Sequence, residues 1–296
     1  MNIAIIVTTY NEHESIAQAL SPLIPQAKNI NAEILVVSSD DLTLKKAKEY
    51  SDSQNFKDIH FIKDNGVGKP AALNLAAKNT TASILFLTDG DMYVDNLSLS
   101  KMLLYFNNPE IAGVSGHPVS LDDKNTLFGY FSHLFCEAAH QRRISTKYTP
   151  MSGYLYAIRK IDGIFPLNER LRSEDAYISG FLKSKGYKLA YEPAAYAYVH
   201  FPKNMSDWIK QKTRSLGGNI QIKNITADLT QINRRSIFED LSMALFPLKY
   251  ATSPKEFIFS LILYPLRLHL WLIIYIKDKL NLYSQGRWEM IKSSKH

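Results

Sequence analysis

Acidic and polar residues follow three apolar runs of the sequence, at the points where strands would end. Thr8-Thr9-Tyr10-Asn11-Glu12 follows the first run, Asp40-Asp41 the second, and Asp89-Gly90-Asp91 a later one. Asp and Gly are common in turns, so any one of these motifs alone could be a solvated turn. If the runs are parallel strands of one sheet, however, their carboxyl ends meet at the edge where open α/β sheets bind ligands. We therefore expect the three motifs to form one site.

The Asp89-Gly90-Asp91 motif has a specific chemical use. Two carboxylates one residue apart, joined by a glycine that permits a tight turn, can hold a hard divalent cation such as Mg²⁺ or Mn²⁺. Such a cation takes few protein oxygens, shares the rest with phosphates and water, and neutralises charge on a departing diphosphate. D-x-D also occurs by chance in many chains, so the motif on its own is a weak indication.

A glycine-rich stretch, Asn65-Gly66-Val67-Gly68-Lys69, invites comparison with a P-loop. The comparison fails, because the spacing is not G-x-x-x-x-G-K-[ST] and Pro70 follows the lysine. Proline instead suits the first position of a helix. Gly68 and Lys69 would then lie at a helix N-terminus, where they could contact phosphate or ribose. A plain loop–helix junction is the alternative.

The elements that must position these motifs alternate between short apolar runs and helical stretches over the first 115 residues. The expected strands are Ile3–Val7, Ile34–Val37, Ile59–Ile62, Ile84–Leu87 and Ala112–Val114. Helices are expected from Glu14, over Leu44–Tyr50 and Pro70–Lys78, and near Leu97–Phe106. Strands this short and apolar, separated by helices, indicate a parallel sheet covered on both faces. The predicted class is α/β, Rossmann-like and mostly parallel.

The alternation breaks after Gly116. Helices are expected over Leu127–Arg143, Glu174–Lys185 and Ser206–Leu216, with extended runs at Ser152–Ile158 and Ala194–His200. On the first of these helices, His133, Glu137 and His140 share one face. That spacing would suit zinc, but we favour a hydrogen-bonded helix face or part of a substrate groove.

Charge is unevenly distributed along the 296 residues, whose formal net charge is +7. Residues 1–200 carry 20 Lys/Arg and 21 Asp/Glu, whereas residues 201–296 carry 15 and 7, so the excess lies in the last third. A basic segment can serve nucleic acid, anionic lipid or solubility. The single cysteine, Cys136, excludes an internal disulfide and favours a reducing compartment. The first residues lack a basic region, so we expect no secretory signal.

The last third also becomes strongly apolar. Phe257–Ile276 is interrupted only by Pro265, Arg267 and His269, and a shorter apolar patch, Leu241–Leu248, precedes it. A free-standing transmembrane helix tolerates a central arginine poorly, at about 2.5–3.5 kcal/mol. A helix lying in the interface tolerates one well if the charge reaches outward to water. The basic flank of Lys277, Lys279 and Arg287 favours membrane association, whether lying or spanning, over a soluble helix pair.

Taken in order, the motifs resemble those of family-2 glycosyltransferases with the GT-A fold. Besides the three acidic motifs, the resemblance rests on Gly66–Asn74 (G-x-G-K-x-x-A-L-N), Met151–Tyr154, Ser173-Glu174-Asp175 (an E-D motif) and Gln211–Arg214 (the start of Q-x-x-R-W). It covers about residues 1–220. It implies a catalytic domain over 1–220, with a nucleotide-binding half over 1–115 and an acceptor-binding half over 116–220. Residues 221–296 would form a helical, membrane-associated region.

The resemblance also implies roles for individual residues. Thr9, Tyr10, Glu12 and Asp40 would surround the nucleotide base and ribose, Gly68 and Lys69 would approach the nucleotide, and Asp89 would help to hold the ribose. Asp91 would bind Mn²⁺ or Mg²⁺ at the diphosphate. Asp175, with Glu174 beside it, would be the general base of an inverting transfer, and Gln211 and Arg214 would contact the diphosphate or the acceptor channel.

Two positions depart from the family pattern. Ser215 replaces the tryptophan that processive members usually keep, which puts synthesis of long polymers in doubt. His200 precedes Phe201-Pro202, where many relatives carry an acid or another histidine. We expect His200 to be a third metal ligand or a diphosphate contact, with an ordinary structural histidine as the alternative.

Three other functions compete with sugar transfer. A nucleotidyltransferase would need a basic, glycine-rich loop after the first strand, where this chain has the acidic T-T-Y-N-E. A nucleic-acid binder would interleave basic and aromatic residues over one face, and we expect no nucleic-acid partner. An inactive scaffold would lack site residues. The expected partners are therefore a nucleotide diphosphate sugar, with UDP favoured and GDP the alternative, and a saccharide or polyprenyl-linked acceptor at the cytoplasmic face of a membrane.

Overall fold

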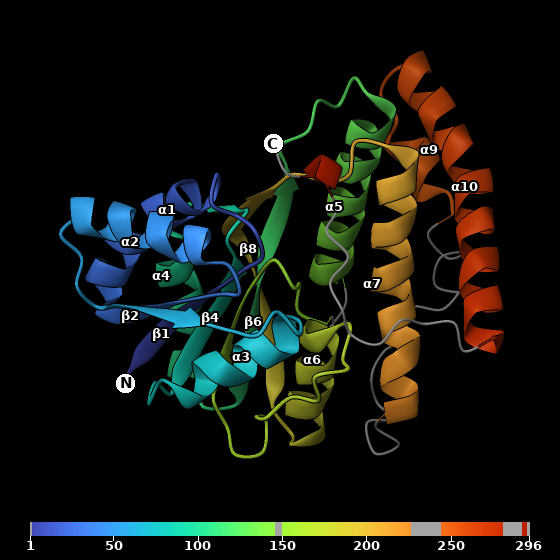
Figure 1. Ribbon diagram of the computed structural model, residues 1–296. Coiled ribbons are helices and arrows are strands. Elements are labelled where there is room, and N and C mark those ends of the chain that lie inside the picture. Colours follow the sequence, from blue (N-terminus) through green and yellow to red (C-terminus); the bar gives the residue numbers. More distant parts are fainter. Residues whose placement is uncertain (1, 146–149, 226–243, 281–291, 295–296) are drawn as a thin grey trace.

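A computed structural model describes residues 2–145, 150–225, 244–280 and 292–294 (Figure 1). Eight strands form one sheet in the order β3-β2-β1-β4-β7-β6-β8-β5. Their bounds are β1 Ile3–Thr9, β2 Ala32–Ser38, β3 Ile59–Lys63, β4 Ile84–Asp89, β5 Tyr93–Val94, β6 Ile111–Ser120, β7 Leu155–Arg159 and β8 Lys188–Val199. The first four strands of the order, from β3 to β4, pair in parallel, so the predicted α/β class is confirmed.

Helices cover both faces of this sheet, as the continuous apolar strands require. On one face lie α1 (Ile16–Ile30), α2 (Asp41–Ser53), α4 (Ser98–Leu103) and the short 3₁₀ helix η1 (Leu104–Asn107). On the other lie α3 (Lys69–Lys78) and α6 (Glu174–Ser184). Successive strand residues alternate between the two cores: Ile5 and Ile34 pack under the first layer, whereas Ile6 and Leu35 pack under the second.

The second half of the sheet differs from a simple parallel series. The expected strand at Ala112–Val114 is part of β6, but β6 does not pair with β4. Instead β7 lies between them and is antiparallel to both. β8 pairs in parallel with β6, and the two-residue β5 pairs antiparallel to β8. This arrangement brings the ends of β4, β6 and β8 and the start of α6 to the same region.

A separate helical layer stands beside the sheet (Figure 1). It contains α5 (Leu127–Ser145), α7 (Met205–Ile225), α9 (Phe246–Tyr250) and α10 (Pro254–Lys279), and the 3₁₀ helix η2 (Lys292–Ser294) completes the described chain. α10 runs unbroken through Pro265. Its inner face packs on α5 and α7 through Leu263, Leu270 and Ile274, which join Trp208 in one core.

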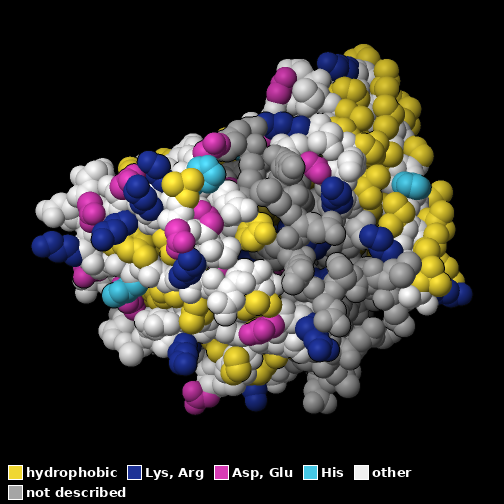
Figure 2. All heavy atoms as spheres, viewed as in Figure 1, with side chains coloured by type: hydrophobic (Ala, Val, Ile, Leu, Met, Phe, Trp, Pro, Cys, Tyr) yellow, Lys and Arg dark blue, Asp and Glu magenta, His cyan; other side chains and the backbone are white. Residues whose placement is uncertain are grey.

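The outer face of α10 is apolar and exposed, and it forms the hydrophobic ridge along one side of the molecule in Figure 2. Among the described helices, the stretch Pro254–Lys277 within α10 has the length and composition that a membrane span needs. The Arg267 side chain is partly exposed, and its guanidinium lies 5.6 Å from the ring centre of Phe135 on α5, where the ring can attract its charge. The expectation that this charge reaches outward to water stays a prediction.

Candidate active site at the carboxyl edge of the sheet

The turns after β1 and β2 are joined by Asp40. Its carboxylate accepts hydrogen bonds from Thr43 N at 2.8 Å, which caps α2, from Ser38 Oγ at 3.0 Å and from Asn11 N at 3.2 Å. Partial burial opposes ionisation, but these hydrogen bonds outweigh it and lower the pKa of Asp40. Asp40 is therefore an ionised carboxylate that fixes the shape of the β1 turn.

Thr9 and Glu12 line the inner side of that turn. Thr9 Oγ1 donates to Val37 O at 3.1 Å, and both side chains are buried. They lie so close to Gly90 that a Cβ there would come within 2.6 Å of Glu12 Oε2 and 2.5 Å of Thr9 Cγ2. Gly90 thus allows the Asp89–Asp91 turn to pack against the β1 turn, as their placement at neighbouring strand ends predicts. Tyr10 is partly exposed beside them.

Lys69 enters the site from the start of α3. Gly66 has φ +64° and Gly68 has φ +148°, conformations that favour glycine, and Pro70 occupies the first turn of the helix. This loop turns the lysine inward, so that its side chain is only 4% exposed. A loop–helix junction is what the sequence indicated, but the side chain points into the protein.

The ammonium of Lys69 joins the two acidic motifs. Its Nζ lies 2.7 Å from Asp89 Oδ1 and 3.3 Å from Glu174 Oε1, and it donates to Gly153 O at 3.0 Å. Burial lowers the pKa of the amine, but the carboxylates of Asp89 and Glu174 outweigh burial and raise that pKa above its ordinary value. Lys69 therefore holds the site together, and its expected contact with the nucleotide stays a prediction.

The carboxylate of Asp89 is held by Lys69 and by Thr8, which belong to two other motifs. The oxygen that meets Lys69 also accepts from Thr8 Oγ1 at 2.7 Å. The side chain retains 16% exposure, so part of the carboxylate faces solvent. This exposed part is where a ribose hydroxyl could be bound.

The two carboxylates of the E-D motif differ in their exposure to solvent. Glu174 is buried and committed to Lys69, whereas Asp175, the next residue on α6, is partly exposed. Adjacent residues on a helix point in different directions, which explains the separation. The Asp175 carboxylate lies against Gly153, where a Cβ would be 3.1 Å from Oδ2. Of the two predicted catalytic acids, only Asp175 is accessible to an acceptor.

The environment of Asp175 raises its pKa. Burial is the largest cause, and backbone hydrogen bonds from Ala176 and Gly153, together with the charges of Lys69 and Arg143, offset it only in part. A carboxylate whose pKa is moved toward neutrality is suited to accept a proton in catalysis.

The charges of Asp91 and Arg214 both act on the buried side chain of Tyr154. Burial raises the pKa of the Tyr154 phenol, and the charges that act on it include Arg214, Asp91 and Asp89. Arg214, on α7, and the acidic turn thus both lie within electrostatic reach of Tyr154. Gln211 lies one turn earlier on the same helix and is partly exposed, and its predicted contact with the diphosphate stays a prediction.

His200 lies at the end of β8, beside the acidic turn. Asp91 lies in the turn before β5 and His200 directly follows β8; the two strands pair antiparallel, with Tyr93 opposite Tyr198. Met92 and Val199, the residues between, pack in one cluster with Phe201. The His200 side chain is 37% exposed.

The residues fit a divalent cation that is completed by a substrate. Within the described ranges, no three His, Cys, Asp or Glu side chains gather closely enough to cage a metal on their own. Mn²⁺ and Mg²⁺ sites at phosphates, however, typically use one or two protein carboxylates and take the remaining ligands from phosphate and water. Asp91 and His200 are the residues predicted to hold such a cation, and this stays a prediction. The zinc alternative is not supported, since His133, Glu137 and His140 contact Asp122 O, Gln141 Nε2 and Tyr191 Oη respectively.

A parallel first half joined through β7 to a mixed second half, with acids at the carboxyl edge, defines a glycosyltransferase fold of the GT-A type. The model of glycosyl transferase family 2 matches residues 4–164, more than half of the chain. The chain belongs to this family.

Individual relatives agree with this assignment. The chain is 24% identical over 235 residues to poly-beta-1,6-N-acetyl-D-glucosamine synthase of Staphylococcus aureus; the match covers 74% of this chain and 55% of that protein, so the chain spans about half of its relative's length. The fold is similar to that of a mannosyltransferase, PcManGT from Pyrobaculum calidifontis, solved with GDP-Man and Mn²⁺ (TM-score 0.60, 18% identity, 96% of this chain and 81% of that one). It is also similar to S. aureus TarS 1–349 with UDP (TM-score 0.53, 17% identity, 86% and 73%).

Sequence reasoning missed two residues at this edge. Tyr154 was included in a motif without a role, and Asp122, which follows β6 and binds His200, was not considered. Asp122 could have been found by the rule that located the other acids, because it also comes directly after a strand. Its strand had been expected to end at Val114, so Asp122 seemed remote from any strand end.

Proposed function

We propose that this chain is an inverting, metal-dependent glycosyltransferase that moves a sugar from a nucleotide diphosphate sugar to an acceptor hydroxyl at a membrane surface. The observation that carries the proposal is the Lys69 ammonium, which binds Asp89 of the nucleotide half and Glu174 of the second half. It sets the partly exposed Asp175 beside the acidic turn where a diphosphate would lie.

In this proposal Asp175 removes the proton of the acceptor hydroxyl while that oxygen attacks the anomeric carbon, opposite the departing nucleoside diphosphate. Because the oxygen attacks opposite the leaving group, the configuration at the anomeric carbon inverts. Arg214 would offset negative charge on the leaving diphosphate. A cation held by Asp91 and His200 would supply further charge neutralisation when bound. The imidazole ligand favours Mn²⁺ over Mg²⁺, which prefers oxygen ligands.

The donor base is the first quantity to measure. Thermal unfolding of the wild-type protein should be followed with UDP, GDP, ADP and CMP, each with and without Mn²⁺. A nucleotide present at about 100 times its Kd adds about 2.7 kcal/mol to the free energy of unfolding, which is a rise of several degrees in Tm. We expect UDP, or else GDP, to stabilise the protein in a Mn²⁺-dependent way.

Two aspartate variants make this test specific. Asp91→Asn should lose the Mn²⁺-dependent part of the stabilisation. Asp41→Asn, which removes a carboxylate that is 79% exposed and paired with Lys63, should keep it. If no nucleotide stabilises the wild-type protein, the proposal is wrong and an inactive scaffold becomes the better interpretation.

The membrane part of the proposal rests on the outer face of α10. From Phe257 to Ile276 its exposed side chains recur at spacings of three and four residues and are apolar apart from His269: Phe257, Ile258, Leu261, Ile262, Pro265, Leu268, Leu272, Tyr275 and Ile276. The inner face is occupied by α5 and α7, so we favour a helix that lies in the interface over one that crosses the bilayer. This location suits a polyprenyl-linked acceptor at the cytoplasmic face, with a saccharide acceptor as the alternative.

Leu268→Glu should therefore weaken binding to anionic liposomes at least tenfold, because Leu268 is 70% exposed on α10 and inserting a leucine contributes about 1.5–3 kcal/mol. Co-sedimentation with phosphatidylglycerol vesicles measures this. Leu104→Glu introduces the same charge at a leucine that is 67% exposed in the nucleotide half, and it should bind like the wild type. Equal binding by both variants would exclude α10 as the membrane contact.

A further inference from the structure

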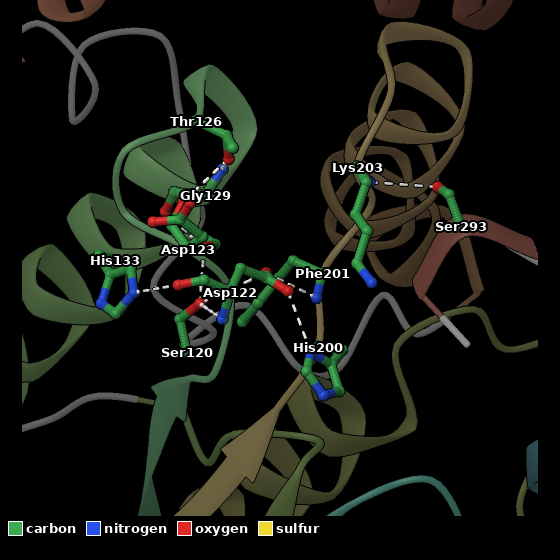
Figure 3. A network of polar contacts seen from close by, with 11 residues as sticks. Ser120, Asp122, Asp123, Thr126, Gly129, His133, His200, Phe201, Lys203 and Ser293 are labelled. Atoms are coloured by element: carbon green, nitrogen blue, oxygen red, sulfur yellow. Dashed lines mark hydrogen bonds and ion pairs between the residues drawn. The ribbon is translucent and has the colours of Figure 1, made fainter. Parts of the chain in front are cut away.

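Asp122 has a buried carboxylate that contacts residues at the ends of β6 and β8 (Figure 3). Its Oδ1 lies 3.1 Å from His200 Nδ1, and its Oδ2 accepts from Phe201 N at 3.0 Å and from Ser120 Oγ at 3.4 Å. The side chain is only 5% exposed. Both oxygens are thus engaged, and one of them holds the ring of a residue in the proposed metal site.

Asp122 is itself held in place by its neighbours. Its backbone N–H donates to Ser120 Oγ at 3.1 Å, and its carbonyl lies 2.8 Å from His133 Nε2 on α5. Ser120 is in turn 2.6 Å from Ser132 Oγ on the same helix. The carboxylate therefore has little freedom to rotate away from His200.

This arrangement determines the tautomer of His200. An ionised carboxylate only accepts hydrogen bonds, so the ring nitrogen that faces it, Nδ1, carries the proton. In the neutral ring the other nitrogen, Nε2, then presents its lone pair on the side away from Asp122. A lone pair binds a cation, whereas a diphosphate oxygen would require an N–H donor. Of the two roles predicted for His200, the contact with Asp122 favours metal ligand.

We propose that Asp122 is a positioning residue that fixes His200 in the Nδ1–H form, so that Nε2 binds the divalent cation shared with Asp91. The inference rests on the proposed function, because it requires a cation at the diphosphate. Its physical basis is the carboxylate–histidine–metal arrangement, in which the outer partner fixes the ring and increases the basicity of the ligating nitrogen. Met92 and Val199, the neighbours of Asp91 and His200 along the chain, pack in one buried cluster, which brings the acidic turn and the end of β8 together.

Asp122→Asn tests the inference with almost no change in shape. The Phe201 N–H needs an acceptor, so it fixes the new amide with its oxygen toward Phe201 and its NH₂ toward His200. Nδ1 must then accept, and the proton moves to Nε2, which can no longer bind a metal. We expect ¹⁵N-histidine NMR of the metal-free variant to show the Nε2–H tautomer. We expect Mn²⁺ affinity, measured by EPR with UDP or GDP, whichever stabilises, to fall 10–100-fold.

Two controls separate positioning from charge or folding. Asp123→Asn makes the same change of charge at the next, exposed residue, and it should leave both tautomer and Mn²⁺ affinity as in the wild type. In a His200→Ala background, Asp122→Asn should cause no further loss of affinity, because its effect passes through the imidazole.

An Asp122→Asn protein that keeps the Nδ1–H tautomer or the wild-type Mn²⁺ affinity would overturn the inference, as would a further loss in the His200→Ala background. If Asp91→Asn still abolished Mn²⁺-dependent nucleotide binding in that case, the proposed function would stand and only the role of Asp122 would fail.

Discussion

Asp175→Asn is expected to lower kcat about 10²- to 10⁴-fold, the usual contribution of a general base, while the KM for the donor changes little. The asparagine keeps the shape of the side chain but cannot take the proton of the acceptor. Release of nucleoside diphosphate from the donor sugar measures the effect even with water as the acceptor.

The pH profile of the wild-type enzyme gives an independent check. Burial raises the pKa of Asp175, and the base acts only when it is ionised. The rate should therefore rise as pH increases through that raised pKa, and Asp175→Asn should lack this dependence. Glu174→Gln is the comparison: it removes the adjacent carboxylate, which is buried against Lys69, so it should change stability but keep the pH dependence. If Glu174→Gln removed turnover and Asp175→Asn did not, the base would have been assigned to the wrong residue.

Lys69→Met is expected to cost about 3–5 kcal/mol in the free energy of unfolding at neutral pH, because it leaves two poorly hydrated carboxylates without their cation. The side chains of Lys69, Asp89 and Glu174 are only 4%, 16% and 9% exposed. Urea denaturation measures the change.

Lys63→Met provides the comparison for this prediction. Lys63 lies 2.6 Å from Asp41, but both side chains are largely exposed, at 56% and 79%. An exposed pair contributes at most about 1 kcal/mol, so this variant should remain close to the wild type. If Lys69→Met were equally well tolerated, Lys69 would not be balancing the charges of Asp89 and Glu174.

The sequence predicted the parts of this site that depend on strand ends. Asp40, Asp89 and Asp91 were located because parallel strands present their carboxyl ends at one edge, and the alternation of short apolar runs with helices was sufficient to indicate that edge. Apolar periodicity also placed α5, α6, α7 and α10. These features depend on local patterns, which a single sequence contains.

The parts that sequence could not predict depend on partners distant along the chain. The glycines and Pro70 were sufficient to predict that Lys69 lies at the start of a helix. That its side chain points into the protein depends on Asp89, Gly153 and Glu174, which come together only in the folded protein. The insertion of β7 between β4 and β6 was missed because a short apolar run does not reveal the direction of its strand. The contact between Arg267 and Phe135 could not be predicted for a similar reason, since Phe135 lies on another helix.

The ammonium of Lys69 also has a consequence for how this site can evolve. Removing Lys69 leaves two poorly hydrated carboxylates without their cation, so this substitution is penalised through folding before any change in chemistry is selected. Descendants of this sequence should therefore keep Lys69 for as long as they keep Asp89 and Glu174. The exposed Asp41 and Lys63, in contrast, are free to diverge independently.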